Sequence, residues 1–169
     1  LLADLRHLRS IGAQGKGVVR PAFSPKDMEA RRWLKARYEE AGLEATIDGV
    51  GNVLGRSRHP GKALLLGSHS DTQPTGGWLD GALGVIYALE VVRALAADDA
   101  TRALAVDAVS LQDEESRFVG CLGSRSLTGA PSGWSERPSF SEKKRAKWFA
   151  SSSTSSPSLF SGMIRLGSL

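Results

Sequence analysis

The sequence has little cysteine, histidine and aromatic content, with one cysteine, three histidines and 7% aromatic residues among 169 positions. Cys121 has no partner for an internal disulfide, and the first residues lack the basic-then-apolar order of a secretion signal. We therefore expect a reducing, cytoplasmic setting, with Cys121 as a small buried residue. No run of eighteen apolar residues occurs, so the sequence predicts no membrane-spanning helix and no membrane partner.

Excess positive charge is confined to the last 39 residues. Residues 131–169 contain six basic and two acidic residues, whereas residues 1–130 contain sixteen of each. The net charge of +4 therefore describes a tail and gives no reason to expect that the body binds nucleic acid. The tail also holds 12 serines without a sustained hydrophobic period, a composition typical of disorder. We divide the chain into a predicted folded body over 1–130 and a Ser-rich basic tail over 131–169.

Hydrophobic periodicity in the body predicts alternating helices and strands. Ser24 and Pro25 are typical of a helix start, and apolar residues at three-to-four spacing predict a helix over 25–41. Alternation over 43–48 predicts a half-buried strand, and a second buried helix is expected over 81–95. The apolar run at 63–66 predicts a strand covered on both faces, and a further buried strand is expected over 103–111. Strands that alternate with helices predict an α/β sheet.

Two of the predicted strands end in polar segments. His69 and Asp71 follow the first, and three adjacent acids, Asp113, Glu114 and Glu115, follow the second. Ligands gather at the carboxyl ends of strands in open α/β sheets, and adjacent acids repel one another unless a cation relieves them. The pattern favours a metal site over a solvated acidic loop. Taken alone, however, the histidine segment could be a polar strand end, and Asp80 could be a helix N-cap.

Several ordered motifs resemble a known family. They are Gly67-Ser68-His69-Ser70-Asp71-Thr72, Gly76-Gly77-Trp78-Leu79-Asp80-Gly81, Asp113-Glu114-Glu115-Ser116-Arg117-Phe118 and Gly123-Ser124-Arg125, with upstream segments Gly15-Lys16-Gly17-Val18-Val19-Arg20, Glu29-Ala30-Arg31-Arg32-Trp33-Leu34 and Asp48-Gly49-Val50-Gly51-Asn52-Val53. Over about residues 3–130 they are similar to zinc-dependent amidohydrolases that include allantoate amidohydrolase and N-carbamoyl-L-amino-acid hydrolase, within the superfamily of two-zinc aminopeptidases and aminoacylases. The resemblance implies a mixed, mostly parallel sheet sandwiched by helices, of which this chain holds the N-terminal part.

The resemblance also implies a site and a reaction. His69 would bind one of two divalent ions, zinc or manganese, Glu115 would bind the second, and Asp80 would bridge them. Asp71 would orient His69, and Glu114 would be the general base that activates water for attack on a carbamoyl, ureido or amide carbon. The substrate would be a small molecule, and the family is homodimeric.

Departures from the family pattern predict an incomplete site. The only histidines are His7, His59 and His69, so two family histidines from later segments are missing, as is the inserted dimerisation domain. We expect a truncated, inactive chain that holds far less than two ions, with residues 131–169 arising from a frameshift or a sequencing error. A sheet without its remaining strands is expected to expose apolar edges and to associate.

Two other functions stay open from the residues. The His-x-Asp, Asp and Glu-Glu pattern is shared with peptidases and aminoacylases of the superfamily, although Ser116-Arg117-Phe118 favours the carbamoylase side. In a different class, the basic tail with Trp134, Trp148 and Phe149 could bind nucleic acid or an anionic surface. Substrate panels would separate a carbamoylase from a peptidase or aminoacylase. Salt-dependent binding that is lost when the tail is removed would support a nucleic-acid or anionic-surface binder.

Overall fold

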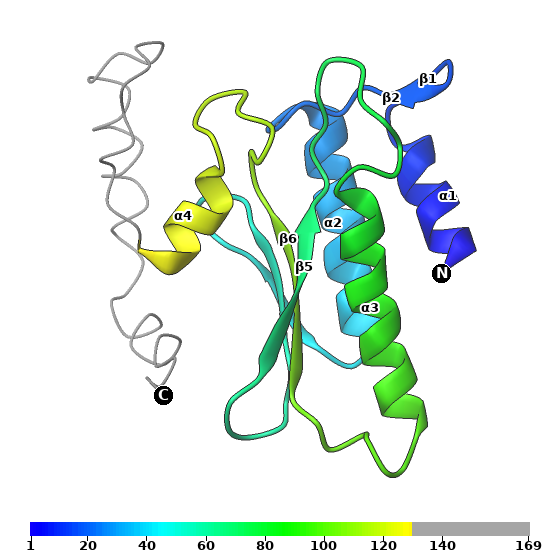
Figure 1. Cartoon of the computed structure of the whole chain (residues 1–169), viewed down its shortest axis with the longest axis vertical. Helices are drawn as coiled ribbons and strands as arrows, with labels where there is room; N and C mark the ends of the chain where they lie inside the picture. The colour runs from blue at the N-terminus through cyan, green and yellow to red at the C-terminus, as the bar shows by residue number, and fades with distance from the viewer. Residues whose placement is uncertain (130–169) are drawn as a thin grey trace. The chain divides into compact units, whose positions relative to one another are not determined.

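The centre of the fold is a four-stranded mixed sheet (Figure 1). The computed structural model describes residues 1–129, and the predicted tail over 131–169 lies outside them. The strands are β3 (Glu44–Ile47), β4 (Val53–Arg56), β5 (Leu64–His69) and β6 (Val106–Leu111), in the order β3-β4-β6-β5. Only β4 runs against the others, so two of the three pairings are antiparallel although three strands share one direction. The predicted α/β fold with a mixed sheet is confirmed.

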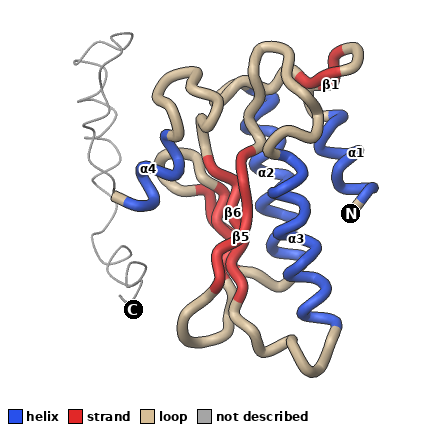
Figure 2. The backbone as a smooth tube through the Cα atoms, in the orientation of Figure 1, coloured by secondary structure: helices blue, strands red, loops and turns tan. Residues whose placement is uncertain are grey.

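Two long helices cover one face of the sheet, α2 (Pro25–Glu40) and α3 (Ala82–Ala97) (Figure 2). Ser24 caps α2 as predicted, because its hydroxyl accepts the Asp27 N–H at 3.1 Å. The Asp27 carboxylate accepts the Phe23 N–H at 2.7 Å, one residue before the cap. Apolar side chains of both helices and the sheet form one core, which includes Leu34, Tyr38, Val53, Val85, Ile86, Leu89 and Ala108.

The remaining elements are short. Helix α1 (Leu2–Ser10) packs against α3, and the two-residue strands β1 (Ala13–Gln14) and β2 (Gly17–Val18) form a hairpin. Helix α4 (Leu122–Thr128) follows the acidic segment. None of these was predicted from periodicity, because each is too short to show a repeating pattern. Within residues 1–129, no helix is long and apolar enough to cross a membrane.

Strand β5 is at the edge of the described sheet and is not covered on both faces. Leu64 is 61% exposed and Leu65 is 39% exposed, so the apolar run at 63–66 was wrongly interpreted as a doubly buried strand. The predicted exposure of an apolar sheet edge is confirmed at these two residues. Cys121 is exposed, and the prediction that it is buried was also wrong, because it lies in the loop before α4 with φ +54°.

Candidate functional site

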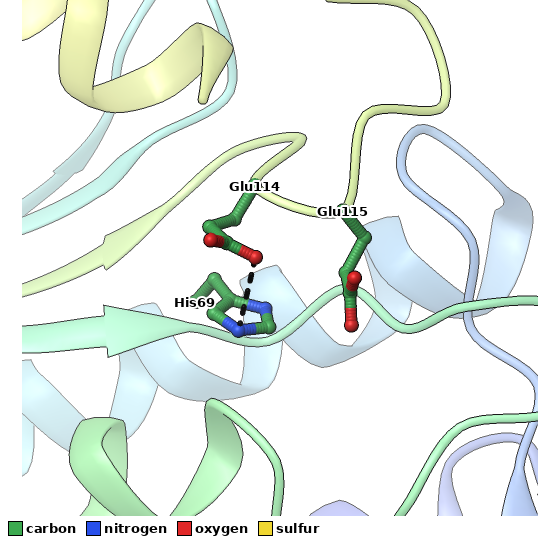
Figure 3. A group of neighbouring side chains, drawn as sticks. All are labelled: His69, Glu114 and Glu115. Atoms are coloured by element: carbon green, nitrogen blue, oxygen red, sulfur yellow. Dashed lines mark ion pairs between the residues drawn. The ribbon is translucent and has the colours of Figure 1, made fainter. Parts of the chain in front are cut away.

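Three predicted site residues come together where β5 and β6 end. The strands are parallel, and His69 lies directly opposite Leu111 in the ladder, so the segments that follow both strands leave the sheet at the same edge. One ligand atom from each of His69, Glu114 and Glu115 lies within 4.8 Å of the other two (Figure 3). The His69 Nε2 atom is 3.4 Å from a Glu114 carboxylate oxygen. The polar strand ends therefore form one cluster, as their placement after parallel strands predicted.

The imidazole of His69 is held by its other nitrogen. Nδ1 lies 3.0 Å from the backbone carbonyl oxygen of Asp71, a bond that requires the proton to be on Nδ1. The Asp71 carboxylate is further away, with Oδ1 at 3.7 Å from the same nitrogen. His69 is only 6% exposed, and its Nε2 atom faces the Glu114 carboxylate.

Asp71 also fixes the position of the second acidic residue. Its Oδ2 accepts the backbone N–H of Glu115 at 3.2 Å, which ties the segment after β6 to the segment after β5. Burial raises the pKa of Asp71, while the Glu115 N–H, Arg31 and His69 act in the opposite direction. The Gln73 side chain donates to the Glu115 carboxylate and restricts it further. Asp71 thus contacts both halves of the cluster.

Asp113 has a structural role that relieves the repulsion among the three acids. Its φ is +54° and its carboxylate is fully buried. The two oxygens accept the backbone N–H groups of Arg117, Phe118 and Val119 at 2.7, 3.0 and 2.8 Å. Both oxygens of this carboxylate are therefore occupied by the backbone of the following loop. Only the other two acids remain to face His69.

Asp80 lies outside the group of ligand atoms that are mutually within 4.8 Å among residues 1–129. Its side chain is not the cap of α3 either, since the N-cap residue is Gly81 and no side-chain capping bond forms. Gly81 nevertheless lies against the imidazole: a Cβ atom built on it would be 2.5 Å from His69 Nε2, and its φ is +64°. The backbone therefore brings Asp80 next to His69 even though its carboxylate is exposed.

Two buried arginines support the cluster, and sequence reasoning assigned them no role. The guanidinium of Arg20 donates to the backbone carbonyls of Ser70, Leu8 and Ile11 at 2.7, 2.6 and 2.8 Å. Burial lowers the pKa of Arg20 to about 10, so it remains charged at neutral pH. Arg31 is equally buried and bonds several groups near the strand ends. Both arginines occur in the upstream motifs, but a motif alone does not reveal that a cation is buried.

One imidazole nitrogen and two carboxylates suit a divalent cation. Zinc in particular accepts His nitrogen together with Asp or Glu oxygen. The hydrogen bond from Nδ1 to the Asp71 carbonyl leaves Nε2 on the side of the ring that faces Glu114, where a metal ligand is needed. The donor set therefore fits a divalent metal, with His69, Glu114 and Glu115 within reach of it.

An α/β sheet with such a cluster after two adjacent parallel strands is typical of metal-dependent hydrolases. The model of peptidase family M28 matches residues 50–144, more than half of the sequence, and the chain belongs to this family. Membership of this metallohydrolase family implies a divalent metal cofactor.

Individual relatives are amidohydrolases. The chain is 36% identical over 132 residues to the N-carbamoyl-L-amino-acid amidohydrolase of Pseudomonas sp. (strain NS671). This match covers 73% of this chain and 32% of that protein. It is 37% identical over 118 residues to the allantoate amidohydrolase of Bacillus subtilis (strain 168), and this match covers 67% of this chain and 29% of that protein. A crystal structure of an amidase of the hydantoinase/carbamoylase family from Burkholderia phymatum matches with 66% identity and a TM-score of 0.73, covering 74% of this chain and 31% of that one. The chain thus spans about a third of the length of these relatives.

Proposed function

We propose that this chain supplies the metal-binding strand ends and the general base of a hydrolase that cleaves linear, non-peptide carbon–nitrogen bonds in small carbamoyl, ureido or amide substrates. The observation that carries the proposal is the grouping of His69, Glu114 and Glu115, whose ligand atoms lie within 4.8 Å of one another, with Nε2 of His69 3.4 Å from Glu114. The similarity to N-carbamoyl-amino-acid and allantoate amidohydrolases supports the substrate class.

The metal ligands in this proposal are His69 and Glu115, with Asp80 as the bridge between two zinc or manganese ions. Asp80 directly precedes Gly81, which lies against the His69 ring, so its backbone position is beside the cluster although its side chain is exposed. When bound, divalent metal polarises the substrate carbonyl and lowers the pKa of water. The Asp71 carbonyl holds His69 in the required tautomer, and the Asp71 carboxylate holds Glu115 through its N–H.

Glu114 is the proposed base because it combines proximity with access. Its side chain is 42% exposed, whereas the carboxylate of Asp113 is fully buried and occupied by three backbone donors. Water and substrate can therefore reach Glu114 but not Asp113. Glu114 takes the proton of the attacking water and returns it to the leaving nitrogen, so the carboxylate is regenerated at the end of each cycle.

A chimera tests the proposed function without assuming that this chain is active by itself. Residues 1–129 replace the matching segment of the Burkholderia phymatum amidase, and hydrolysis of N-carbamoyl-L-amino acids, allantoate and dipeptides is measured. We expect turnover of the first two substrate types. Glu114→Gln should lower kcat by about 10²- to 10⁴-fold with metal content unchanged, whereas Glu44→Gln, at an exposed position of β3, should leave kcat unchanged.

A peptidase is the second candidate, because the matching family model is that of peptidase family M28. If the chimera hydrolyses dipeptides and leaves both carbamoyl and ureido compounds intact, the peptidase assignment replaces the proposed one. For the 169-residue chain itself, we expect far less than two bound ions and no turnover. Stoichiometric metal with measurable hydrolysis would contradict that expectation.

A further inference from the structure

The guanidinium of Arg31 lies next to both parts of the candidate site, the end of β6 and the segment that follows β5. Arg31 is in the second turn of α2 and has no exposed surface. One terminal nitrogen donates to the Ser110 carbonyl and the other to the Leu111 carbonyl, both at 3.2 Å, so the side chain bonds the last two residues of β6. Arg31 therefore holds the strand from which Glu114 and Glu115 leave the sheet.

The same guanidinium faces the segment after β5. Its Nη2 atom is 3.7 Å from Oδ1 of Asp71, and both side chains have no exposed surface. Among the described residues this carboxylate oxygen has no hydrogen-bond partner, while Oδ2 accepts the Glu115 N–H. Arg31 is thus the counter-charge next to the buried Asp71 carboxylate and restricts its orientation.

Arg31 is itself fixed in position. Its Nε atom donates to both carboxylate oxygens of Asp27 at 3.0 and 3.1 Å, and Nη1 also donates to the Gly51 carbonyl at 3.0 Å. The Gln112 side chain donates to Asp27 as well, at 3.0 Å. A planar group held at Nε, Nη1 and Nη2 cannot rotate, and lysine, with a single ammonium group, cannot reproduce these contacts.

We propose that Arg31 is a positioning residue of the metal centre, which acts through Asp71 to set the place of Glu115 relative to His69. The contact with Asp71 orients the carboxylate that receives the Glu115 N–H, and the contacts with β6 fix the strand end on the opposite side. The consequence for metal affinity rests on the proposed function, whereas the consequence for the Glu115 N–H does not.

The first test measures amide hydrogen exchange by NMR on the metal-free 169-residue protein. In Arg31→Lys, we expect the Glu115 amide to exchange about tenfold faster, which corresponds to the loss of one hydrogen bond. The amides of Phe118 and Val119 lie in the same loop but are held by Asp113, so their exchange should not change. Arg32→Lys is the matched control, because Arg32 is adjacent in sequence and exposed.

Uniformly faster exchange at all three amides would assign Arg31 to general fold stability and overturn the proposal. Unchanged exchange at Glu115 would overturn it as well. Asp27→Asn is the second variant, which keeps the guanidinium and weakens its anchor at Nε. It should accelerate Glu115 exchange in the same selective way but less, and it decides the question by the same criteria if Arg31→Lys does not fold.

The second test measures the Co²⁺ affinity of the chimera with the Burkholderia phymatum amidase from the visible absorption of the bound ion, because the 169-residue chain alone is expected to hold far less than two ions. Groups that orient metal ligands typically contribute ten- to a hundredfold to affinity, so we expect about tenfold weaker binding in Arg31→Lys. In an Asp71→Asn background the same substitution should add little, because the effect passes through Asp71. Multiplicative effects in that double-mutant cycle would contradict the proposal. If the chimera without substitutions binds no Co²⁺, the proposed metal site is wrong, and the exchange experiment still decides the role of Arg31.

Discussion

The two ends of strand β5 reverse the usual relation between polarity and burial. At its amino end, Leu64 and Leu65 are 61% and 39% exposed, whereas His69 at its carboxyl end and the next two residues, Ser70 and Asp71, are 6%, 0% and 0% exposed. Buried polar groups are costly unless they are hydrogen-bonded, and exposed leucines forgo the stabilisation of burial. Exposed leucines and buried polar residues thus occur at opposite ends of one strand.

The difference between the ends lies in what surrounds them. The carboxyl end is enclosed by polar side chains: Arg20 donates to the Ser70 carbonyl, the Ser110 hydroxyl donates to the Ser70 hydroxyl, and Arg31 lies 3.7 Å from the Asp71 carboxylate. Within residues 1–129, the amino end has only β6 as a neighbouring strand, with Leu64 opposite Val106. Each end of β5 is therefore buried only where other side chains pack against it. We interpret the buried polar end as the part of the strand that serves the candidate site. The following substitutions test that interpretation.

Removal of the Arg20 guanidinium should cause the largest loss of stability. Arg20→Met leaves the carbonyls of Leu8, Ile11 and Ser70 buried without their charged donor. We expect the free energy of unfolding to fall by about 3–5 kcal/mol, as for other broken buried charge contacts. Urea denaturation followed by circular dichroism measures the change. Arg6→Met, on the exposed side of α1, serves as the control. A loss of less than 1 kcal/mol would show that the polar end does not depend on this arginine.

Removal of the Asp113 carboxylate should destabilise the protein by about 2–3 kcal/mol, because three buried or half-buried backbone N–H groups lose their acceptor. The variant is Asp113→Ala, and the matched control is Glu114→Gln, which removes an adjacent but partly exposed charge. The control should leave the free energy of unfolding within about 0.5 kcal/mol. Equal losses in the two variants would remove the distinction between a structural and a chemical acid.

Part of the candidate site could be predicted from the sequence and part could not. The proximity of His69 to Glu114 and Glu115 followed from their place after two predicted strands of one sheet, a local signal combined with one rule of sheet topology. The family resemblance suggested roles for Asp71 and Asp80, and these roles remain proposals. The three backbone bonds of Asp113 could not be predicted, because they depend on a left-handed φ and a loop conformation that tertiary packing selects.

The fold was predictable to a similar depth. Helix α2 and its Ser24 cap carry a local signal in their own residues, as does the long apolar helix α3. The exposure of Leu64 carried no such signal, since a short apolar run gives the same pattern whether one face or both faces are covered. The buried positions of Arg20 and Arg31 depend on carbonyls from distant segments, and periodicity gives no information on those.

Gly81→Ala tests how closely the polar end is packed. A Cβ atom there would lie 2.5 Å from both Nε2 and the backbone oxygen of His69, and the φ of +64° disfavours alanine independently. We expect a loss of about 2 kcal/mol together with a displaced imidazole, visible as a changed His69 ring signal in NMR spectra. Gly42→Ala is the control, since its φ is +91° but no atom lies within 4 Å of the added carbon. That variant should lose only about 1 kcal/mol, and an equal loss at both sites would mean that contact with His69 adds nothing.

Leu64→Lys at the exposed end of β5 should have the smallest effect on stability and a visible effect on association. The side chain is already 61% exposed, so the free energy of unfolding should change by no more than about 0.5 kcal/mol. Charged residues on edge strands discourage pairing with a second chain, and we expect the variant to sediment as a smaller species than the wild-type protein at equal concentration. The control is Leu104→Lys, which is 57% exposed but lies outside the sheet. If Leu64→Lys unfolds the protein, this end of β5 is buried in solution, and the contrast between the two ends of the strand is lost.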